Sequence, residues 1–336
     1  MSTEQRKLII PKKTTAGWVR LNRKWEFQAQ KFVPVRGFGI HAGGDTSTAN
    51  VVTADKVDYI SGTTAARPAY NLTIARRFMG SSGNSNIGLY IGGINTSGDA
   101  TLYADKSDYA AGITAANANF NFSEIRTSVS AVSNISFGVF TGGLSYPGSV
   151  VTNMAEKADY VSGTMGLDTG FNLTVARRFA ATAGNTSFGL IVGGQDASPS
   201  LVADKVDYTA EITGALIGFN FPVATTVCAA VGNNSFGVFA GGLTSANVDT
   251  AYKADYTAET MTADTGFNLS SVRQLHSAAG NAKFGVFAGG IAASRMTTAD
   301  KADYIAEITV ARGGYDLSSA RRGLGSASNA TPGSSA

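Results

Sequence analysis

Histidine and cysteine are almost absent from this chain. Its 336 residues include two histidines, His41 and His276, and one cysteine, Cys228. A single cysteine excludes an intrachain disulfide, and its apolar surroundings indicate a buried small hydrophobe rather than a reactive thiol. The two histidines lie far apart, so the sequence offers no zinc or copper ligand set and no Ser-His-Asp or Cys-His constellation. We therefore expect no catalytic residue, no metal and no cofactor.

Charge and long apolar runs are also scarce. Charged residues make up 15% of the chain, below the roughly 25% of an average soluble domain, whereas glycine is abundant at 40 residues. No apolar run approaches the roughly 18 residues that span a bilayer, and Leu8-Ile9-Ile10 is too short for the core of a signal peptide. This composition is typical of a turn-rich β protein, and we expect a soluble chain without a transmembrane segment or Sec-type signal.

Positive charge is concentrated at the N-terminus. Residues 1–36 contain nine Lys or Arg against two Glu, a net charge of +7, which leaves −4 for the rest of a chain of net charge +3. A basic arm on an acidic body suggests contact with something negative, and a solvated tail is the alternative. Because the arm carries no known nucleic-acid module and the body is acidic, binding to nucleic acid is not expected.

One pattern of about 50 residues recurs six times after this arm. Each copy begins with an aromatic or aliphatic residue, Gly, three mostly apolar residues and Gly-Gly, as in Phe38 to Gly44. Successive copies start 49, 50, 51, 48 and 48 residues apart, at Phe38, Ile87, Phe137, Phe188, Phe236 and Phe284. A period of this length is typical of propellers, solenoids and other repeat arrays.

A second block follows each Gly-Gly and ends on a tyrosine. Its fullest form is Ala-Asp-Lys-x-Asp-Tyr, as in Ala54 to Tyr59, and it is degenerate in the fifth copy, at Lys253 to Tyr256. Eleven residues after each tyrosine stands another aromatic residue, such as Tyr70. Beyond this aromatic residue, five of the copies carry an arginine: Arg76, Arg126, Arg177, Arg273 and Arg321. The remaining copy carries Thr225 at this position.

Each copy contains four short runs compatible with β-strands and no sustained helical period. In chain order these are the small-residue run after the arginine, the run into Gly-Gly, the run into Asp-x-Tyr, and the run around the later aromatic residue. Four antiparallel strands of this length form one propeller blade, and six blades can pack around an axis. The sequence therefore predicts an all-β, six-bladed β-propeller over residues 37–336, preceded by the arm at residues 1–36.

The end of the chain predicts how this ring closes. The first copy has no small-residue strand before Phe38, whereas residues 320–329 match residues 75–84. We expect the C-terminal segment to supply the missing strand and to remove an open sheet edge.

The order of arginine, small-residue strand, apolar strand ending in Gly-Gly, variable loop and strand ending in Tyr resembles the kelch motif. The resemblance covers residues 37 to about 330, although Phe or Tyr stands where kelch repeats usually carry Trp. It implies a kelch-like propeller that binds partners through its variable loops. The Gly-Gly pairs are expected to serve backbone geometry, and the repeated Asp and Lys to pair between blades or to bond loop amides rather than to bind metal.

Two sets of candidate ligand-binding residues fall on one face of such a propeller. The first set comprises the arginines before each small-residue strand: Arg76, Arg77, Arg126, Arg177, Arg178, Arg273, Arg321 and Arg322. The second set comprises polar loops after each Gly-Gly, at residues 45–53, 94–102, 144–153, 195–202, 243–251 and 291–298. The alternative for the arginines is that at least one of each pair bridges to a carboxylate of a neighbouring blade. The loops suit hydrogen bonding to glycans or polar protein surfaces, and equally suit solvated turns.

The arm holds both tryptophans of the chain and is predicted to form a small hairpin that turns at Asn22-Arg23. Aromatic residues with basic neighbours are favourable interface anchors. The candidate attachment residues are Trp18, Arg20, Arg23, Lys24, Trp25, Phe27 and Phe32.

The Trp-x-x-x-Asn-x-x-Trp pattern of the arm is similar to short N-terminal segments of tailed-phage structural proteins, and the repeats resemble kelch-like repeats encoded by phages of aquatic bacteria. The resemblance implies a virion component assembled in the host cytoplasm, a tail fibre, appendage or decoration protein. The arm would bind other virion proteins, and the propeller would face a host-surface glycan or protein. The alternatives are a cellular kelch-type interaction scaffold or lectin and, more remotely, an enzyme with an unrecognised site. A homo-oligomer remains open.

Overall fold

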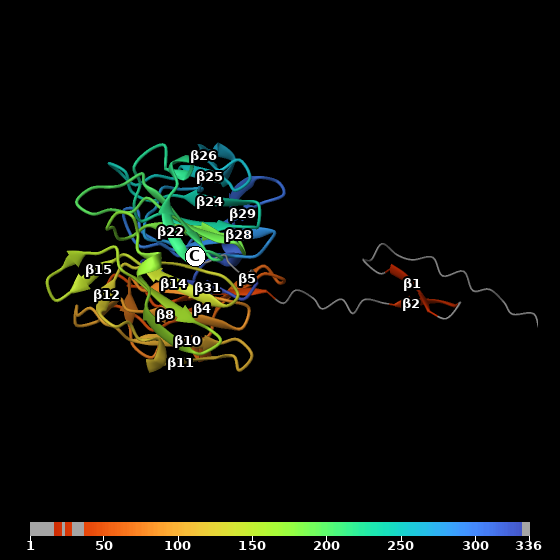
Figure 1. The fold of residues 1–336 in the computed structure, drawn as a ribbon, viewed down its shortest axis with the longest axis horizontal. Helices are drawn as coiled ribbons and strands as arrows, with labels where there is room; N and C mark the ends of the chain where they lie inside the picture. The colour runs from red at the N-terminus through yellow and green to blue at the C-terminus, as the bar shows by residue number, and fades with distance from the viewer. Residues whose placement is uncertain (1–16, 22–23, 29–36, 331–336) are drawn as a thin grey trace, which may run out of the picture. The chain divides into compact units, whose positions relative to one another are not determined.

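Two separate sets of β-strands make up the described part of the chain (Figure 1). The computed structural model describes residues 17–21, 24–28 and 37–330. The chain divides into two compact units, Met1–Arg36 and Gly37–Ala336.

In the first unit, β1 (Gly17–Leu21) pairs antiparallel with β2 (Lys24–Gln28). Trp18 stands opposite Phe27 in this register, and Arg20 opposite Trp25. Two paired strands agree with the predicted hairpin. Its proposed turn at Asn22-Arg23 and the candidate residue Phe32 lie outside the described residues.

Most described strands of the second unit form six four-stranded antiparallel sheets, which share one internal order, and the other five form a two-stranded and a three-stranded sheet in the connections. The inner strands are β7 (Gly80–Gly83), β13 (Ser130–Ser133), β19 (Ala181–Gly184), β23 (Ala229–Gly232), β27 (Ser277–Gly280) and β31 (Gly325–Ser328). The second strands are β3 (Phe38–Ala42), β8 (Ile87–Ile91), β14 (Phe137–Thr141), β20 (Phe188–Val192), β24 (Phe236–Ala240) and β28 (Phe284–Ala288). The third strands are β4 (Ala54–Asp58), β10 (Ala104–Asp108), β17 (Ala155–Asp159), β21 (Ala203–Asp207), β25 (Ala251–Asp255) and β29 (Ala299–Asp303). The outer strands are β5 (Thr63–Ala66), β11 (Ile113–Ala116), β18 (Thr164–Leu167), β22 (Ile212–Ala215), β26 (Thr260–Ala263) and β30 (Ile308–Ala311).

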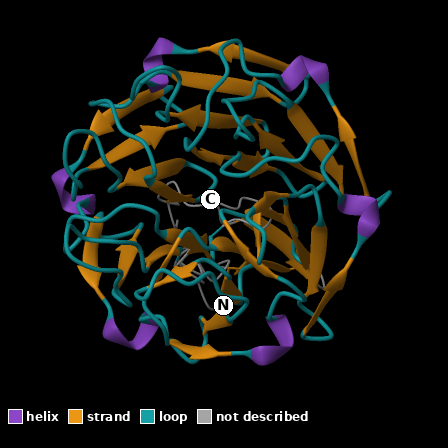
Figure 2. Ribbon diagram, turned by 90° about the vertical axis from the view of Figure 1, so that its left-hand side faces the viewer, coloured by secondary structure: helices purple, strands orange, loops and turns teal. Residues whose placement is uncertain are grey.

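Side-chain size and burial explain this order. The inner strands consist of small residues, mostly Gly, Ala and Ser, and are buried almost throughout, whereas the outer strands are mostly exposed. Each inner strand contacts the next one along the chain, from β7 to β31, and β31 in turn contacts β7. Small side chains let the six strands approach a common centre, around which Figure 2 shows the sheets arranged. The prediction of an all-β domain is confirmed, and the arrangement of its sheets is propeller-like.

The predicted outer strand was misplaced. It was expected around the later aromatic residue, but β5 (Thr63–Ala66) ends before Tyr70, which closes a 3₁₀ helix instead. The 3₁₀ turn places the Tyr70 side chain in the core at 4% exposure, while the Thr and Ala residues of β5 face solvent and show no apolar alternation. The same turn recurs at η1 (Pro68–Tyr70), η2 (Ala118–Phe120), η3 (Thr169–Phe171), η4 (Ile217–Phe219), η5 (Thr265–Phe267) and η6 (Gly313–Tyr315). Figure 2 shows these short helices at the periphery.

The two ends of the second unit share one sheet. β31 pairs antiparallel with β3, with Gly325 opposite Ala42 and Ser328 opposite Gly39. The Phe38 N–H also donates to Asn329 Oδ1 at 2.8 Å, across 291 residues of sequence. The C-terminal segment therefore occupies the strand position that the repeat pattern predicts for it.

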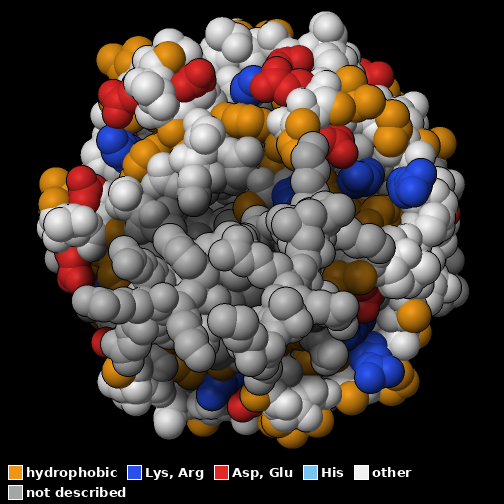
Figure 3. All heavy atoms as spheres, turned by 90° about the vertical axis from the view of Figure 1, so that its right-hand side faces the viewer, with side chains coloured by type: hydrophobic (Ala, Val, Ile, Leu, Met, Phe, Trp, Pro, Cys, Tyr) orange, Lys and Arg blue, Asp and Glu red, His pale blue; other side chains and the backbone are white. Residues whose placement is uncertain are grey.

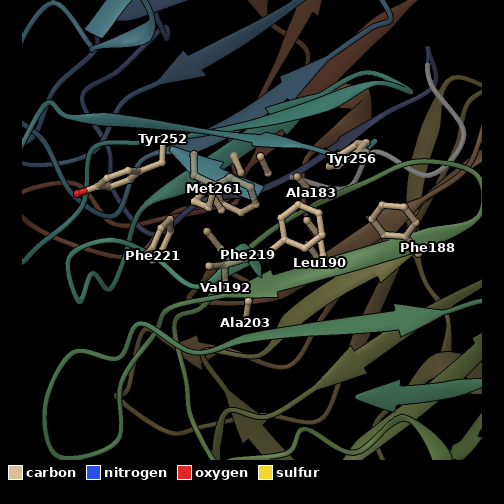
Figure 4. Close-up of a cluster of buried hydrophobic side chains, with 14 residues drawn as sticks. Ala183, Phe188, Leu190, Val192, Ala203, Phe219, Phe221, Tyr252, Tyr256 and Met261 are labelled. Atoms are coloured by element: carbon tan, nitrogen blue, oxygen red, sulfur yellow. The ribbon is translucent and has the colours of Figure 1, made fainter. Parts of the chain in front are cut away.

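Apolar clusters lie between neighbouring sheets. One of them joins Phe188 and Leu190 of β20 to Phe219 and Tyr256 of the adjoining segments (Figure 4). The rings of Phe188 and Tyr256 pack edge to face with centroids 5.1 Å apart. Such a contact adds about 1 kcal/mol to the stability that burial of the rings provides.

Two glycine positions of the repeat are required, one by a close approach and the other by the conformation of the backbone. A Cβ atom on Gly39 would lie 2.5 Å from Tyr59 Oη, so the first glycine and the tyrosine of the motif pack as one unit. The Gly-Gly pair adopts positive φ angles, 67° at Gly43 and 93° at Gly44, which most other residues avoid. The repeated glycines thus serve backbone geometry and packing.

Candidate ligand-binding face

The first arginine of each connection lies in the interior, where it joins two sheets. The carbonyl of Arg76 accepts the Gly44 N–H of one sheet at 2.8 Å. Its guanidinium enters the next sheet, where it donates to the Gly92 carbonyl at 2.9 Å and to Asp105 Oδ2 at 2.6 Å. The same kind of ion pair joins Arg126 to Glu156, Arg177 to Asp204, Arg273 to Asp300 and Arg321 to Asp55.

These five arginines are at most 1% exposed and therefore do not line a surface. Burial lowers the pKa of Arg76, and the neighbouring Asp105 offsets part of that effect. A buried ion pair that also bonds backbone carbonyls holds sheets together, because loss of either partner leaves an unpaired charge in the interior. Of the two interpretations of the arginines, bridging to a carboxylate describes Arg76, Arg126, Arg177, Arg273 and Arg321.

The exception in the arginine series has a matching exception among the carboxylates. Thr225 stands where the other connections carry arginine, and Tyr252 of β25 stands at the position of the paired acid. Tyr252 is 6% exposed and packs against Phe221 with ring centroids 5.2 Å apart. Both charges are thus replaced together at this junction, which explains the degenerate motif of the fifth copy.

The second residue of each connection lies beside the variable loop. β6 (Arg76–Arg77) pairs with β9 (Ile94–Asn95), and β12 (Ile125–Thr127) pairs with β15 (Leu144–Tyr146). Isolated bridges complete the series, joining Arg178 to Gln195, Thr226 to Leu243, Gln274 to Ile291 and Arg322 to Asp45. We call the surface made by these residues and loops the loop face. It lies on the side with β12 and β15 in Figure 1 and faces the viewer in Figure 2.

Three arginines converge on one carboxylate in the loop face. Asp45 Oδ2 accepts hydrogen bonds from Arg77 Nη1 at 3.2 Å and Arg295 Nη2 at 2.5 Å, and Asp45 Oδ1 accepts one from Arg322 Nε at 3.1 Å. The Asp45 side chain is 3% exposed, and those of the three arginines are 22–29% exposed. Sequence reasoning singled out Arg77 and Arg322, and included Asp45 and Arg295 only as members of the loops 45–53 and 291–298. Arg178 takes no part in this cluster and lies over the ring of Phe179, 5.5 Å from its centroid.

A hollow of about 230 Å³ adjoins this cluster. Its lining includes Arg77, Arg295, Thr46, Asn50 and Asn95, and no aromatic side chain is among the described residues that line it. Asn50 Nδ2 donates to the carbonyls of Ile94 at 3.0 Å and Asn95 at 2.6 Å. The loop of the first copy is thereby tied to that of the second, and the walls of the hollow are held in place.

A cycle of backbone hydrogen bonds surrounds the centre of the loop face. Its members precede the inner strands and have positive φ angles: Phe78, Ser128, Phe179, Val227, Leu275 and Gly323. Each N–H donates to the carbonyl of the previous member, and the Phe78 N–H donates to the Gly323 carbonyl, over distances of 2.8–3.2 Å. Non-glycine residues adopt such angles at a cost of about 1 kcal/mol, which a hydrogen bond of this kind can offset.

The two histidines are buried, whereas Cys228, expected to be buried, is partly exposed and packs against the edge of a core cluster. Burial lowers the pKa of His41 and of His276 to about 3 and raises that of the Cys228 thiol to about 12. His41 Nδ1 contacts Ser277 Oγ at 2.7 Å, so both groups belong to the packed core. All three side chains are therefore uncharged near neutral pH.

The third strands use their two acidic positions differently. Asp55 faces the interior and pairs with Arg321, whereas Asp58 Oδ1 accepts the N–H groups of Ile60 and Ser61 at 2.9 and 3.0 Å. These amides, that of Ser61 most strongly, lower the pKa of Asp58. Ion pairing between sheets and bonding of loop amides were both expected for the repeated acids.

Partly exposed ion pairs join a lysine of one third strand to a glutamate in the turn that follows the next third strand along the chain. Lys157 pairs with Glu211 at 2.7 Å, and equivalent pairs join Lys205 to Glu259 and Lys253 to Glu307. Figure 3 shows the face opposite the loop face, whose visible rim carries acidic and basic side chains interspersed. Balanced charges of this kind contribute little to stability and attract neither sign strongly.

Within residues 17–21, 24–28 and 37–330, no three His, Cys, Asp or Glu side chains come together as a metal site would require. In the same residues, no helix has the length and apolar character to cross a bilayer. Of the predicted attachment residues, Trp18, Arg20, Lys24, Trp25 and Phe27 stand on the paired strands β1 and β2, and Arg23 and Phe32 are outside the described part.

Comparison with known proteins identifies no relative. No model of a known protein family matches the chain, and a search of curated proteins finds no similar sequence. Inferences about function therefore depend on the geometry above and on the sequence patterns.

Proposed function

We propose that Gly37–Ala336 is a six-bladed, kelch-like β-propeller closed by β31, and that it is a non-enzymatic binding module whose loop face meets a polar ligand. In this proposal the protein is a component of a tailed-phage particle, such as a tail fibre, appendage or decoration protein. Residues 1–36 attach it to other virion proteins, and the loop face is displayed toward a host-surface glycan or protein.

Two cyclic sets of contacts support the ring. The inner strands contact one another from β7 to β31 and back to β7, and six backbone hydrogen bonds return from Gly323 to Phe78. Both cycles have six members, one for each copy of the sequence pattern. Small residues on the inner strands suit the crowded axis of such a ring.

The observation that carries the binding proposal is the different use of repeated and variable residues. The recurring arginines, acids, tyrosines and glycines are occupied in contacts between or within sheets, as Arg76 and Asp105 illustrate. The loops after Gly-Gly have the same frame in every copy but differ in sequence and length. In repeat folds such loops form the binding surface, because the frame tolerates their variation.

The phage setting is supported by the Trp-x-x-x-Asn-x-x-Trp pattern of the arm, and attachment through the arm is supported by its secondary structure and charge. An isolated two-stranded hairpin such as β1–β2 is marginally stable in water and gains from a partner surface. The nine basic residues of the arm suit an acidic partner.

The proposal is tested by a glycan array and by particle composition. The full chain is expected to bind one class of surface glycan on the array and to be found by mass spectrometry in purified phage particles. A chain lacking residues 1–36 should retain glycan binding and lose incorporation into particles. Glycan or protein binding without any particle association would favour a cellular lectin or scaffold, and incorporation of the truncated chain would contradict attachment by the arm.

A further inference from the structure

The charged cluster around Asp45 occurs at one of six equivalent positions. Asp45 follows Gly43-Gly44 directly, and the residues that follow Gly-Gly in the other copies carry no charge. These residues are Ile94, Leu144, Gln195, Leu243 and Ile291. The repeated frame therefore does not require a charge here, and the cluster is a local addition to the loop face.

The cluster carries more positive charge than its carboxylate can balance. Arg77, Arg295 and Arg322 together contribute +3 against the −1 of Asp45. The nearest loop also contains Asp99, but that residue is exposed and does not line the hollow. Because the three arginine side chains are about three-quarters buried, water and salt screen this excess less than at an open surface.

Hydrogen-bonding capacity is also left over. Arg77 and Arg295 share the single oxygen Asp45 Oδ2, although each guanidinium carries five N–H donors. Arg322 holds the other carboxylate oxygen through its Nε and does not line the hollow. An ion pair that only links the first copy to the last would need only one of these arginines.

The hollow beside Arg77 and Arg295 suits a sugar residue. Its volume of about 230 Å³ is several times the roughly 30 Å³ of a water molecule and smaller than a drug-sized pocket. Hydroxyl and amide side chains from two tied loops line it, including Thr46, Thr48 and Asn95. Such groups bond sugar hydroxyls, while a guanidinium bonds a carboxylate through two parallel N–H groups.

We infer that this hollow is a subsite for an acidic glycan, in which Arg77 and Arg295 hold the carboxylate of a uronic or similar acidic sugar and the polar loop residues hold its hydroxyls. The inference rests on the proposed binding role of the loop face and specifies its ligand class. Asp45 positions the two arginines and limits their affinity for simple anions, because it occupies part of the same donor set.

Calorimetric titration of the full chain with a hexaglucuronate and with a neutral glucan hexamer tests this inference. Wild type is expected to bind the hexaglucuronate and to bind the neutral hexamer at least tenfold more weakly. Arg77→Gln and Arg295→Gln should each weaken hexaglucuronate binding at least tenfold with an unchanged melting temperature. The control is Lys283→Gln, which also removes one positive charge but at a residue that lies exposed in the turn between β27 and β28, beside the end of β29 and outside the loop face.

Asp45→Asn distinguishes a ligand-binding role of the three arginines from a purely structural one. If the arginines serve a ligand, removal of the competing carboxylate should tighten hexaglucuronate binding several-fold, even if the melting temperature falls. Weaker binding by this variant at native stability, or unchanged binding by Arg77→Gln and Arg295→Gln, would overturn the inference. Inorganic sulfate that binds as tightly as the hexaglucuronate would overturn the sugar specificity.

Failure of this inference and failure of the proposed function have different signatures. A chain that binds neutral glycans on the array, with affinity unaffected by Arg77→Gln, would refute the acidic subsite and leave the binding role of the loop face intact. A chain that binds no glycan and no surface protein would contradict both.

Discussion

Arg321 and Asp55, which are 266 residues apart in sequence, form a buried ion pair between the last connection and the first sheet. The guanidinium of Arg321 also donates to the Gly43 carbonyl at 2.9 Å, and its own carbonyl accepts the Gly290 N–H at 2.8 Å. One residue thus contacts the backbone of the first and the last copies. The same contacts recur at Arg76, Arg126 and Arg273, so the junction of the two ends resembles the internal ones.

Arg321→Met is expected to destabilise the second unit by about 4 kcal/mol, because it leaves Asp55 charged and unpaired in the interior. Urea unfolding monitored by far-UV circular dichroism measures the loss in the free energy of unfolding. Arg322→Met is the control, since Arg322 is partly exposed and its pair with Asp45 is worth about 1 kcal/mol or less. Equal effects of the two substitutions would contradict a special role for the buried pair.

The uncharged pair Thr225 and Tyr252 can be introduced by mutation at another junction, in place of its arginine and acid. Arg126 and Glu156 are the best target, because Phe122 stands where Phe221 packs against Tyr252. Arg126→Thr alone and Glu156→Tyr alone should each cost about 3 kcal/mol or more, since each leaves one buried charge unpaired.

The double variant Arg126→Thr/Glu156→Tyr should recover most of that loss. A double-mutant cycle in urea is expected to show a coupling free energy of about 2 kcal/mol or more. Additive losses would mean that the paired replacement of Thr225 and Tyr252 is not compensatory.

Gly39→Ala is predicted to destabilise the protein by about 2 kcal/mol. The added methyl group would overlap Tyr59 Oη and lie 2.7 Å from the Ala279 Cβ atom. Gly214→Ala is the matched control, because Gly214 is also a strand glycine but has no atom within 4 Å of an added Cβ. Thermal melts of the two variants should differ clearly, and a loss at Gly214 as large as that at Gly39 would refute the packing argument.

The buried histidines predict that acid destabilises the protein below about pH 6.5. The pKa of His276 is lowered to about 3 by burial and then by Arg273, against an ordinary value of 6.5. Between these values the unfolded state binds more protons, so stability is full above pH 6.5 and falls as the pH drops toward 3. The loss from pH 6.5 to 4 is about 3 kcal/mol for this residue.

His276→Leu is expected to make the stability profile less steep over that range, while His41, whose pKa burial also lowers to about 3, still contributes. The substitution suits the site, because Leu324 stands at the equivalent position of the last copy. Urea midpoints measured at pH 7.0, 5.5 and 4.5 provide the comparison. A variant whose midpoints fall with acid as steeply as those of wild type would show that His276 does not contribute.

Most of the fold could be predicted because the pattern recurs. Gly-Gly, the Asp-x-Tyr block and the small-residue run each mark a strand that the structure contains, and residues 320–329 indicated the partner of Phe38. The outer strand was not predicted correctly, because solvent-facing residues such as those of Thr63–Ala66 need no apolar alternation. The buried aromatic residue after it drew the prediction to the wrong segment.

Only part of the candidate site could be predicted, because several of its residues do not recur in the other copies. Buried and partly exposed arginines look alike in sequence, so Arg76 and Arg77 could not be separated until their partners were known. Asp45 and Arg295 occur in single copies, and their contact joins segments 250 residues apart. Alignment of the six copies shows Asp45 as the one charged residue after Gly-Gly, a signal that could have identified it.

The central claim, that the loop face is the binding surface, is tested most directly by hydrogen–deuterium exchange of the full chain with and without the glycan that binds it most strongly. The account predicts slower exchange in loops of the loop face, most of all residues 45–53, 94–102 and 291–298. It predicts no change in the opposite turns at residues 59–63 and 208–212. Protection confined to those turns, or absent from every loop after Gly-Gly, would contradict it.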